Sequence, residues 1–384
     1  MKRKKEILTK KSLEFLEKYL DNPTPSGSEE KGQQIWLDYI TQFTDKSFQD
    51  EQLNAVAVLN PNKKYRVALE AHADEISWQV SYISDTGFLY VNANGGPDPM
   101  VAIGNHVHVL TEDGIIEGVF GWPAVHLREG DTLKADEKHL YVDIGASSKD
   151  EVLEMGVNIG DAVVFYNLYR ILNKKFIVGR ALDNRIGGLI IAEVARLIHE
   201  EKIDLPFSVM FVNSVQEEVG LYGAEIIAER LKPDMAIITD VTHDTSTPFI
   251  QPEKHGDMKC GKGPVIAIAP AVKNKLLKLM RKSATEADLP FQLAANSKET
   301  GTDTEKIAHS DSGVMSVLIS PPIRYMHTPV EIVHMDDVEN TILIILETLK
   351  NISPEVLRKN RTIPFYEEQG DEAESGSESK KMRS

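Results

Sequence analysis

The stretch FSVMFVNSVQEEVGLYGAEIIAERL, residues 207–231, decides how the chain folds. Its first part, FSVMFVNSV, is an apolar run typical of a buried strand, and its last part, GAEIIAERL, has the spacing of an amphipathic helix. Two carboxylates, Glu217 and Glu218, stand side by side between them. Like charges at this spacing repel unless a cation lies between them or one of them holds a proton. The stretch therefore predicts a strand, a loop and a helix, with positive charge bound at the loop.

The alternation of strand and helix continues on both sides of this stretch. Strand patterns lie at residues 66–72, 235–240, 263–270 and 314–320, and helix patterns lie at 186–200, 274–289 and 338–352. Strands that alternate with helices are typical of a mostly parallel sheet covered on both faces. We therefore expect an α/β fold with a mostly parallel, mixed sheet flanked by helices.

A β-rich segment interrupts this pattern. Between about Glu75 and Tyr169 short β-rich runs alternate with turns, and helical periodicity is almost absent. The pair Asp113-Gly114 between two such runs is a hairpin signal. We expect a small inserted β-barrel at 75–170, an α/β domain in two parts at 1–74 and 171–355, and a disordered acidic tail at 367–384.

The N-terminal region is predicted to be helical. Residues 8–42 fit one or two helices interrupted by NPTPSGSEEKG, and Ser26 and Glu29 have capping-box spacing, which would begin the second helix there. The first twenty residues have a basic start but no unbroken apolar stretch. We therefore expect an amphipathic helix at the start of the chain and not a secretory signal.

Composition narrows the classes of partner. The formal net charge of −16 argues against nucleic acid, because phosphate binding favours a basic face. No apolar run approaches the length of a membrane span, so no membrane partner is expected. Cys260 is the only cysteine, which excludes an intramolecular disulfide and argues against a thiolate zinc site. These features fit a cytoplasmic location.

Polar residues suited to metal binding recur at the ends of predicted strands and the starts of helices. In open α/β sheets, ligands bind beyond the carboxyl ends of the strands, so these residues are expected to converge on one crevice. The candidates are His72, Asp183, Glu217, Glu218, Asp240 and, in a loop after the last predicted strand, His327.

Imidazole nitrogen and carboxylate oxygen suit divalent zinc, and cobalt and manganese also tolerate them. Two such ions carry four positive charges, which three carboxylates and one bridging hydroxide would balance. That balance holds if Asp183, Glu218 and Asp240 bind metal, which leaves Glu217 free as a general base for a metal-bound water. Asp74 lies two residues beyond His72, where it could hydrogen-bond the ring nitrogen of His72 that does not face the metal.

Simpler interpretations exist for these residues. Asp183 could cap the helix that follows it, and Asp240 could begin a turn. His72 could be an ordinary histidine at the end of a strand, and His327 an ordinary loop residue. His106 and His108 lie two apart on a strand pattern, but no carboxylate accompanies them. A subunit contact is a better interpretation of that pair than a metal site.

Taken together, the motifs resemble the co-catalytic metal aminopeptidases of the glutamyl-aminopeptidase and tetrahedral-aminopeptidase family. The resembling pieces, in the family's order between about residues 22 and 350, are NPTPSGSEEKG, AHADEIS, GRALDNRIGG, VQEEVGLYGA, ITDVTHDT, GKGP, GTDTEKIA and PIRYMHTPVE. The chain departs from the family's usual pattern at Ala73, Ser77 and Asn184, none of which is a predicted ligand.

The resemblance implies two divalent ions per subunit in a zinc-peptidase-like fold. It implies His72 and Asp240 on one metal, Glu218 and His327 on the other, and Asp183 bridging both. It also implies that the inserted barrel is an oligomerisation domain, and that the chain forms a homo-oligomer, a dodecameric tetrahedral shell with its active sites facing inside.

The expected function is hydrolysis of N-terminal residues from short peptides by a metal-bound hydroxide, with Glu217 as general base and Asp74 supporting it. A metal-dependent deacylase or amidohydrolase acting on N-acylated amino acids or peptides is an alternative, and a non-catalytic peptide-binding shell is another. Arg324 would favour acidic substrate residues if it reaches the site, but it could instead be structural. Thr302 and Asp303 could cap a helix or contact substrate.

Overall fold

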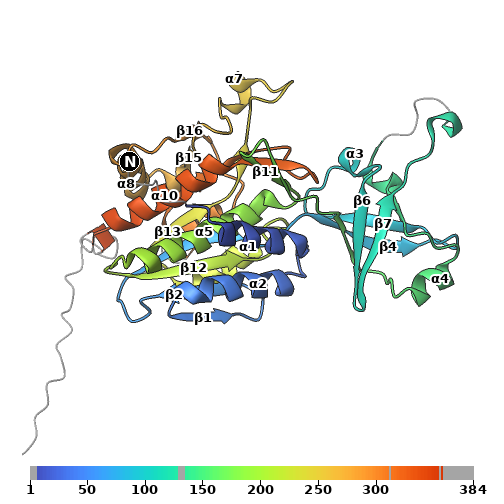
Figure 1. Ribbon diagram of the computed structural model, residues 1–384, viewed down its shortest axis with the longest axis horizontal. Coiled ribbons are helices and arrows are strands. Elements are labelled where there is room, and N and C mark those ends of the chain that lie inside the picture. The colour runs from blue at the N-terminus through green and yellow to red at the C-terminus, as the bar shows by residue number, and fades with distance from the viewer. Residues whose placement is uncertain (1–6, 129–134, 311–312, 354–355, 358–384) are drawn as a thin grey trace, which may run out of the picture.

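The computed structural model describes residues 7–128, 135–310, 313–353 and 356–357. The tail predicted to be disordered, 367–384, lies outside these residues. The described part folds as a large sheet covered by helices and a separate small barrel at one end (Figure 1). None of its helices is both long enough and apolar enough to cross a membrane.

The main sheet has eight strands in the order β1-β2-β12-β3-β13-β17-β15-β16. Their bounds are Lys46–Gln49, Ala55–Leu59, Ser208–Ser214, Arg66–His72, Met235–Thr239, Met315–Ser320, Val265–Ile268 and Gln292–Ala295, in the same order. The four central strands, β12, β3, β13 and β17, are all parallel, whereas β2 and β15 run antiparallel to their inner neighbours. The predicted mostly parallel, mixed sheet is therefore confirmed.

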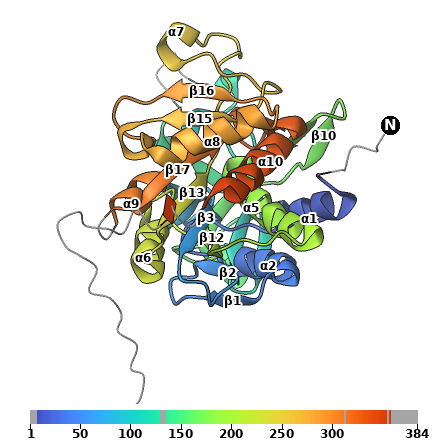
Figure 2. The ribbon, with the colours of Figure 1, turned by 90° about the vertical axis from the view of Figure 1, so that its left-hand side faces the viewer.

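Helices cover both faces of this sheet, as Figure 2 shows. One face carries α1 (Lys10–Asp21), α2 (Glu30–Ile40), α5 (Leu182–Glu201), α8 (Lys275–Glu286) and α10 (Met335–Asn351). The other face carries α6 (Tyr222–Leu231) and α9 (Thr304–His309) over a smaller apolar cluster. Because both faces are covered, every residue of β3 except Arg66 is buried, as expected for a central parallel strand.

Six strands close into an antiparallel barrel in the order β4-β5-β8-β7-β6-β9, at the right of Figure 1. Their bounds are Ser77–Ile83, Leu89–Asn94, Tyr141–Asp143, Gly114–Phe120, His106–Thr111 and Ala162–Phe165, in the same order. The ring of Trp78 packs edge-on against Phe120 and Phe165 in the barrel core, with centroids 4.8 and 5.0 Å away. Thr111 pairs with Gly114, so the hairpin predicted at Asp113-Gly114 is confirmed.

The structure has a second sheet of five short strands, which the sequence analysis did not predict. Its order is β10-β11-β19-β18-β14, with bounds Arg170–Leu172, Phe176–Gly179, Glu331–His334, Pro322–Arg324 and Thr242–His243. Strands of two to four residues are too short to show a periodicity in the sequence. This sheet joins the segment before α5 to the β18–β19 loop.

The remaining elements are short. They are the helices α3 (Pro99–Ala102), α4 (Lys149–Glu154) and α7 (Pro252–His255), and the 3₁₀ turns Thr41–Phe43, Val125–Leu127, Glu137–His139 and Pro270–Val272.

The capping box predicted at Ser26 is wrong. Helix α2 begins only at Glu30, and no side chain caps it. The hydroxyl of Ser26 instead donates to Oδ2 of Asp74 at 2.6 Å, and Glu29 accepts from the N–H of Gly27. A tertiary bond to a buried carboxylate has replaced the local cap that the spacing suggested.

Candidate metal centre

Three neighbouring parallel strands deliver polar side chains to one edge of the main sheet. His72 is the last residue of β3, and Ser214, the last residue of β12, pairs with it. Asp240 directly follows β13, the neighbour of β3 on the other side. Glu217 and Glu218 lie just beyond β12, in the loop before α6. The common direction of the strands therefore brings these residues to the same place.

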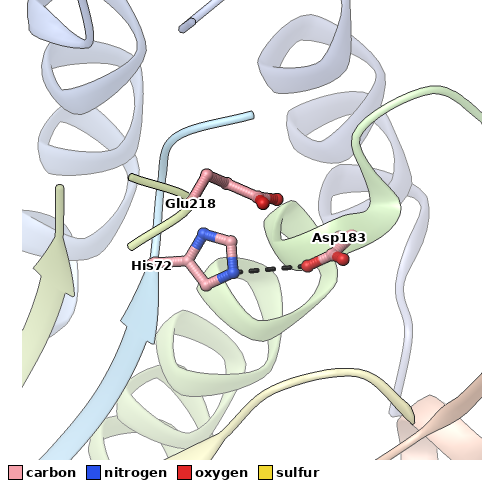
Figure 3. A group of neighbouring side chains, drawn as sticks. All are labelled: His72, Asp183 and Glu218. Carbon is pink, nitrogen blue, oxygen red and sulfur yellow. Dashed lines mark ion pairs between the residues drawn. The ribbon is translucent and has the colours of Figure 1, made fainter. Parts of the chain in front are cut away.

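Asp183 lies between the two candidate histidines. Its Oδ1 is 3.3 Å from Nε2 of His72, and its Oδ2 is 3.3 Å from Nε2 of His327 (the first contact is drawn in Figure 3). The residue opens α5 with non-helical φ and ψ, so it does not sit in the regular helix. A carboxylate whose two oxygens face two different imidazoles has the arrangement of a bridging ligand.

The other carboxylates divide between the two sides of Asp183. Oδ1 of Asp240 lies 3.6 Å from Nε2 of His72, and Oε1 of Glu218 lies 3.5 Å from Nε2 of His327. Glu217 is further away, with Oε2 4.0 Å from Nε2 of His72. All six sequence-predicted residues at the crevice are thus neighbours in space.

The donor set and its spacing fit divalent metal ions. Ligand atoms of two groups, His72/Asp183/Glu218 and His72/Glu217/Asp240, lie within 4.8 Å of one another. Two ligand atoms that each lie about 2.1 Å from a tetrahedral ion are roughly 3.4 Å apart, which matches the contacts of 3.3 to 3.6 Å described above. Imidazole and carboxylate without thiolate is also a set that zinc accepts.

The electrostatics of the crevice favour bound positive charge. Burial raises the pKa of Glu217 to about 10, with the carboxylates of Asp240 and Asp303 adding to the rise. Burial likewise raises the pKa of Glu218 to about 7. Burial lowers the pKa of His327, but hydrogen bonds to Asp183 and Glu218 outweigh it and raise that pKa to about 11. The carboxylates therefore need protons, imidazolium or metal ions between them.

Asp74 supports this arrangement from behind. It is fully buried, its Oδ1 lies 3.4 Å from Nδ1 of His72, and its backbone oxygen lies 3.2 Å from the same nitrogen. The same side chain accepts the backbone N–H groups of Glu217 and Glu218, at 3.0 and 3.2 Å. The Asp74 carboxylate therefore contacts His72, as the sequence predicted. It also fixes the loop that carries Glu217 and Glu218.

Glu331 was not singled out in the sequence analysis, although it ends the motif PIRYMHTPVE. Its side chain is buried, its Oε1 accepts the backbone N–H of His327 at 2.8 Å, and its Oε2 accepts that of Asp183 at 3.1 Å. His327 has a left-handed backbone, with φ of 62°, which a residue with a Cβ rarely adopts without support. No local pattern identifies Glu331, because its partners lie in another element and in an irregular loop.

The barrel also contacts the site. Nδ1 of His327 lies 3.0 Å from the carbonyl oxygen of Gly96, in the loop that follows β5. A Cβ at Gly95 would come within 3.3 Å of Cβ of Glu218, so the loop packs closely against this side of the centre. A ring that donates from Nδ1 has Nε2 free to face Asp183.

Other residues considered in the sequence analysis lie elsewhere. His106 and His108 are on β6 of the barrel and belong to neither ligand group. Asp303 stands before α9 without a capping hydrogen bond and instead accepts the hydroxyl of Ser214, so of the two roles considered for this residue its side chain does not fill the capping one. Thr302 lines the crevice, and its Oγ1 accepts the N–H of Thr304.

The profile of the family M42 glutamyl aminopeptidase matches residues 54–344. The lysyl aminopeptidase of Pyrococcus furiosus is 32% identical over 347 residues, which cover 89% of this chain and 97% of that protein.

Solved structures of the same kind superpose over nearly their whole length. The TET aminopeptidase of a marine sediment Thaumarchaeota archaeon has a TM-score of 0.87 at 30% identity and covers 91% of this chain and 99% of its own. PhTET1-12s, a dodecamer, has a TM-score of 0.76 at 30% identity and covers 87% and 98%. The chain therefore belongs to the M42 glutamyl aminopeptidase family, and it is a metalloaminopeptidase, a peptide-bond hydrolase that acts on N-terminal residues.

Proposed function

We propose that this aminopeptidase works with two divalent ions per subunit. His72 and Asp240 would hold one, Glu218 and His327 the other, and Asp183 would bridge them. The observation that carries this proposal is the position of Asp183, whose two oxygens each lie 3.3 Å from a different imidazole nitrogen. Ions bound there would polarise the peptide carbonyl and make a water molecule more acidic. Zinc suits the ligand set best, and cobalt and manganese are also compatible.

Glu217 is the proposed general base. It adjoins the ligand Glu218, and its carboxylate lies farther from His72 than that of Asp240 does. Without metal, burial and neighbouring carboxylates raise the pKa of Glu217, and nearby bound cations would lower it again and leave the carboxylate ready to accept a proton. We infer that Glu217 takes a proton from the attacking water and passes it to the nitrogen of the leaving peptide. Asp74, which binds the backbone of Glu217, would keep the base in place.

We propose a separate function for each of the two domains. Residues 1–74 and 171–355 would form the catalytic domain, and 75–170 the barrel domain that makes subunit contacts in a homo-oligomer. PhTET1-12s is a dodecamer, and we propose the same assembly here, with short peptides as substrates. The family is described as glutamyl aminopeptidase, whereas the relative from Pyrococcus furiosus is named a lysyl aminopeptidase. Family membership therefore does not determine which N-terminal residue is preferred.

The proposal is tested by removing and restoring metal. Protein stripped with a chelator would be assayed on aminoacyl amides before and after addition of zinc, cobalt or manganese, with N-acetylated versions alongside. We expect restored cleavage of free-amine substrates only, together with two bound ions per chain by elemental analysis. Cleavage of the acetylated set would indicate a deacylase, and one ion per chain would overturn the bridging role of Asp183.

A further inference from the structure

A cavity of about 200 Å³ opens onto the candidate metal centre. The five proposed ligands and Glu217 are among the residues that line it. Thr242, Thr300, Thr302 and Met326 contribute to the remaining walls. A peptide whose first carbonyl group reaches the ions must place part of its N-terminal residue in this space. The lining residues other than the ligands therefore contact the residue that is removed.

These walls carry almost no charge. Within the described part of the chain, the lining side chains other than the ligands and Glu217 are Val241, Thr242, His243, Thr300, Thr302 and Met326, with Gly301 contributing backbone. The one titratable group among them is His243, and burial lowers its pKa below the ordinary value. Its imidazole is therefore neutral near pH 7 and presents no fixed charge to a substrate.

Arg324 does not supply the missing positive charge. Its Nε donates to Oδ2 of Asp244 at 2.8 Å, and its guanidinium lies over the ring of Phe176, 5.5 Å from the centroid. Asp244 also accepts the N–H groups of Ser246 and Cys260, so the ion pair ties a loop together. Arg324 is not among the residues that line the cavity. Of the two roles considered from the sequence, the structural one fits these contacts.

From these observations we propose that the cavity selects peptides whose N-terminal side chain is uncharged, of the size of Leu or Met, over those that begin with Glu, Asp, Lys or Arg. A charged side chain would lose hydration in the cavity and find no opposite charge free to pair with it, because Asp183, Glu218 and Asp240 are committed to the ions and Glu217 to the proton of the attacking water. The cost of burying an unpaired charge makes this discrimination at least ~10-fold in kcat/KM. The inference rests on the metal centre proposed above.

The test is a panel of aminoacyl p-nitroanilides with Leu, Met, Glu, Lys and Arg, assayed with the metal-loaded protein. We expect the Leu and Met substrates to give the highest kcat/KM. Thr242→Lys should raise the ratio of Glu to Leu hydrolysis at least ~10-fold, because it introduces a positive charge into the wall. Thr285→Lys, on the outer face of α8, is the matched control and should leave that ratio unchanged.

The outcomes separate the preference from the function. Hydrolysis led by the Glu or Lys substrate in the unaltered protein would overturn the preference alone, and so would a ratio that Thr242→Lys and Thr285→Lys change equally. Absence of hydrolysis across the whole panel, with metal bound, would overturn the proposed centre and the preference with it. The variant Arg324→Gln gives a second test. If Arg324 selected acidic residues, this variant would hydrolyse the Glu substrate more slowly relative to the Leu substrate, and that result would contradict the proposal.

Discussion

The side chain of Glu331 holds the backbone of Asp183, because its Oε2 accepts the Asp183 N–H at 3.1 Å. Its other oxygen accepts the N–H of His327, so one carboxylate fixes two proposed ligands that come from different elements. Both hydrogen bonds go to backbone N–H groups and not to the side chains of the proposed ligands. Glu331 therefore acts through the backbone, as a positioning residue.

Replacing Glu331 by Gln should lower metal affinity by roughly 10-fold to 100-fold, because an amide NH₂ cannot accept an N–H in place of one carboxylate oxygen. Titration calorimetry with zinc measures the affinity. Asp337→Asn is the matched control: Asp337 is also buried and accepts two backbone N–H groups, from Gly261 and Gly263, but touches no proposed ligand. That variant should lose stability and keep its metal affinity, and equal losses in both variants would refute a specific role for Glu331.

The glutamate pair allows the two proposed roles to be separated. Glu217→Gln should lower kcat by at least ~10²-fold while both ions stay bound, because it removes the base and not a ligand. Glu218→Gln should instead release metal from the side of His327. Elemental analysis of both variants, alongside kinetics, checks the assignment, and it would be reversed if Glu217→Gln were the variant that lost metal.

Asp74→Asn should lower kcat by roughly 10-fold to 100-fold with a smaller effect on KM, since Asp74 orients both His72 and the loop of Glu217. Ser26→Ala removes the hydroxyl that donates to the same carboxylate, and a milder loss is expected. A change confined to KM in Asp74→Asn would contradict the positioning role.

Without metal, the stability of the protein should fall as pH rises. The pKa of Glu217 is raised to about 10 and that of His327 to about 11, so the folded state binds protons that the unfolded chain has already released. The stabilising effect of the protonated His327 is complete below the ordinary histidine pKa of about 6.5 and is lost as pH rises towards 11.

Protonated Glu217 acts in the same direction, because deprotonation of a buried carboxyl costs stability between its ordinary pKa and about 10. Thermal unfolding of stripped protein should show a falling Tm between about pH 6.5 and 10. Added zinc should raise Tm most at the upper end of this range, because the ions take the place of the protons. A Tm of stripped protein that rises with pH would contradict this account.

Much of the site could be predicted from sequence because regular strands carry it. His72 and Asp240 end strands whose apolar runs are plain in the sequence, and parallel strands must deliver their carboxyl ends to one edge. Glu331 was not predicted because its role depends on two backbone N–H groups, and the pattern of side chains in a sequence does not indicate backbone partners. Ser26 was misassigned for a related reason, since its tertiary partner Asp74 lies 48 residues away.

The contact between Gly96 and His327 bears on the order in which the protein acquires activity. These residues are 231 positions apart in the chain, and they meet only when the barrel and the second sheet are both in place. Contacts between such distant positions form late, because the intervening chain must first be ordered. During synthesis the barrel and the glutamate pair emerge well before His327, so a nascent chain carries the proposed base but an incomplete set of the proposed ligands. We therefore expect peptide hydrolysis to begin only after all eight strands of the main sheet have been made, and regain of activity to be among the last events of refolding.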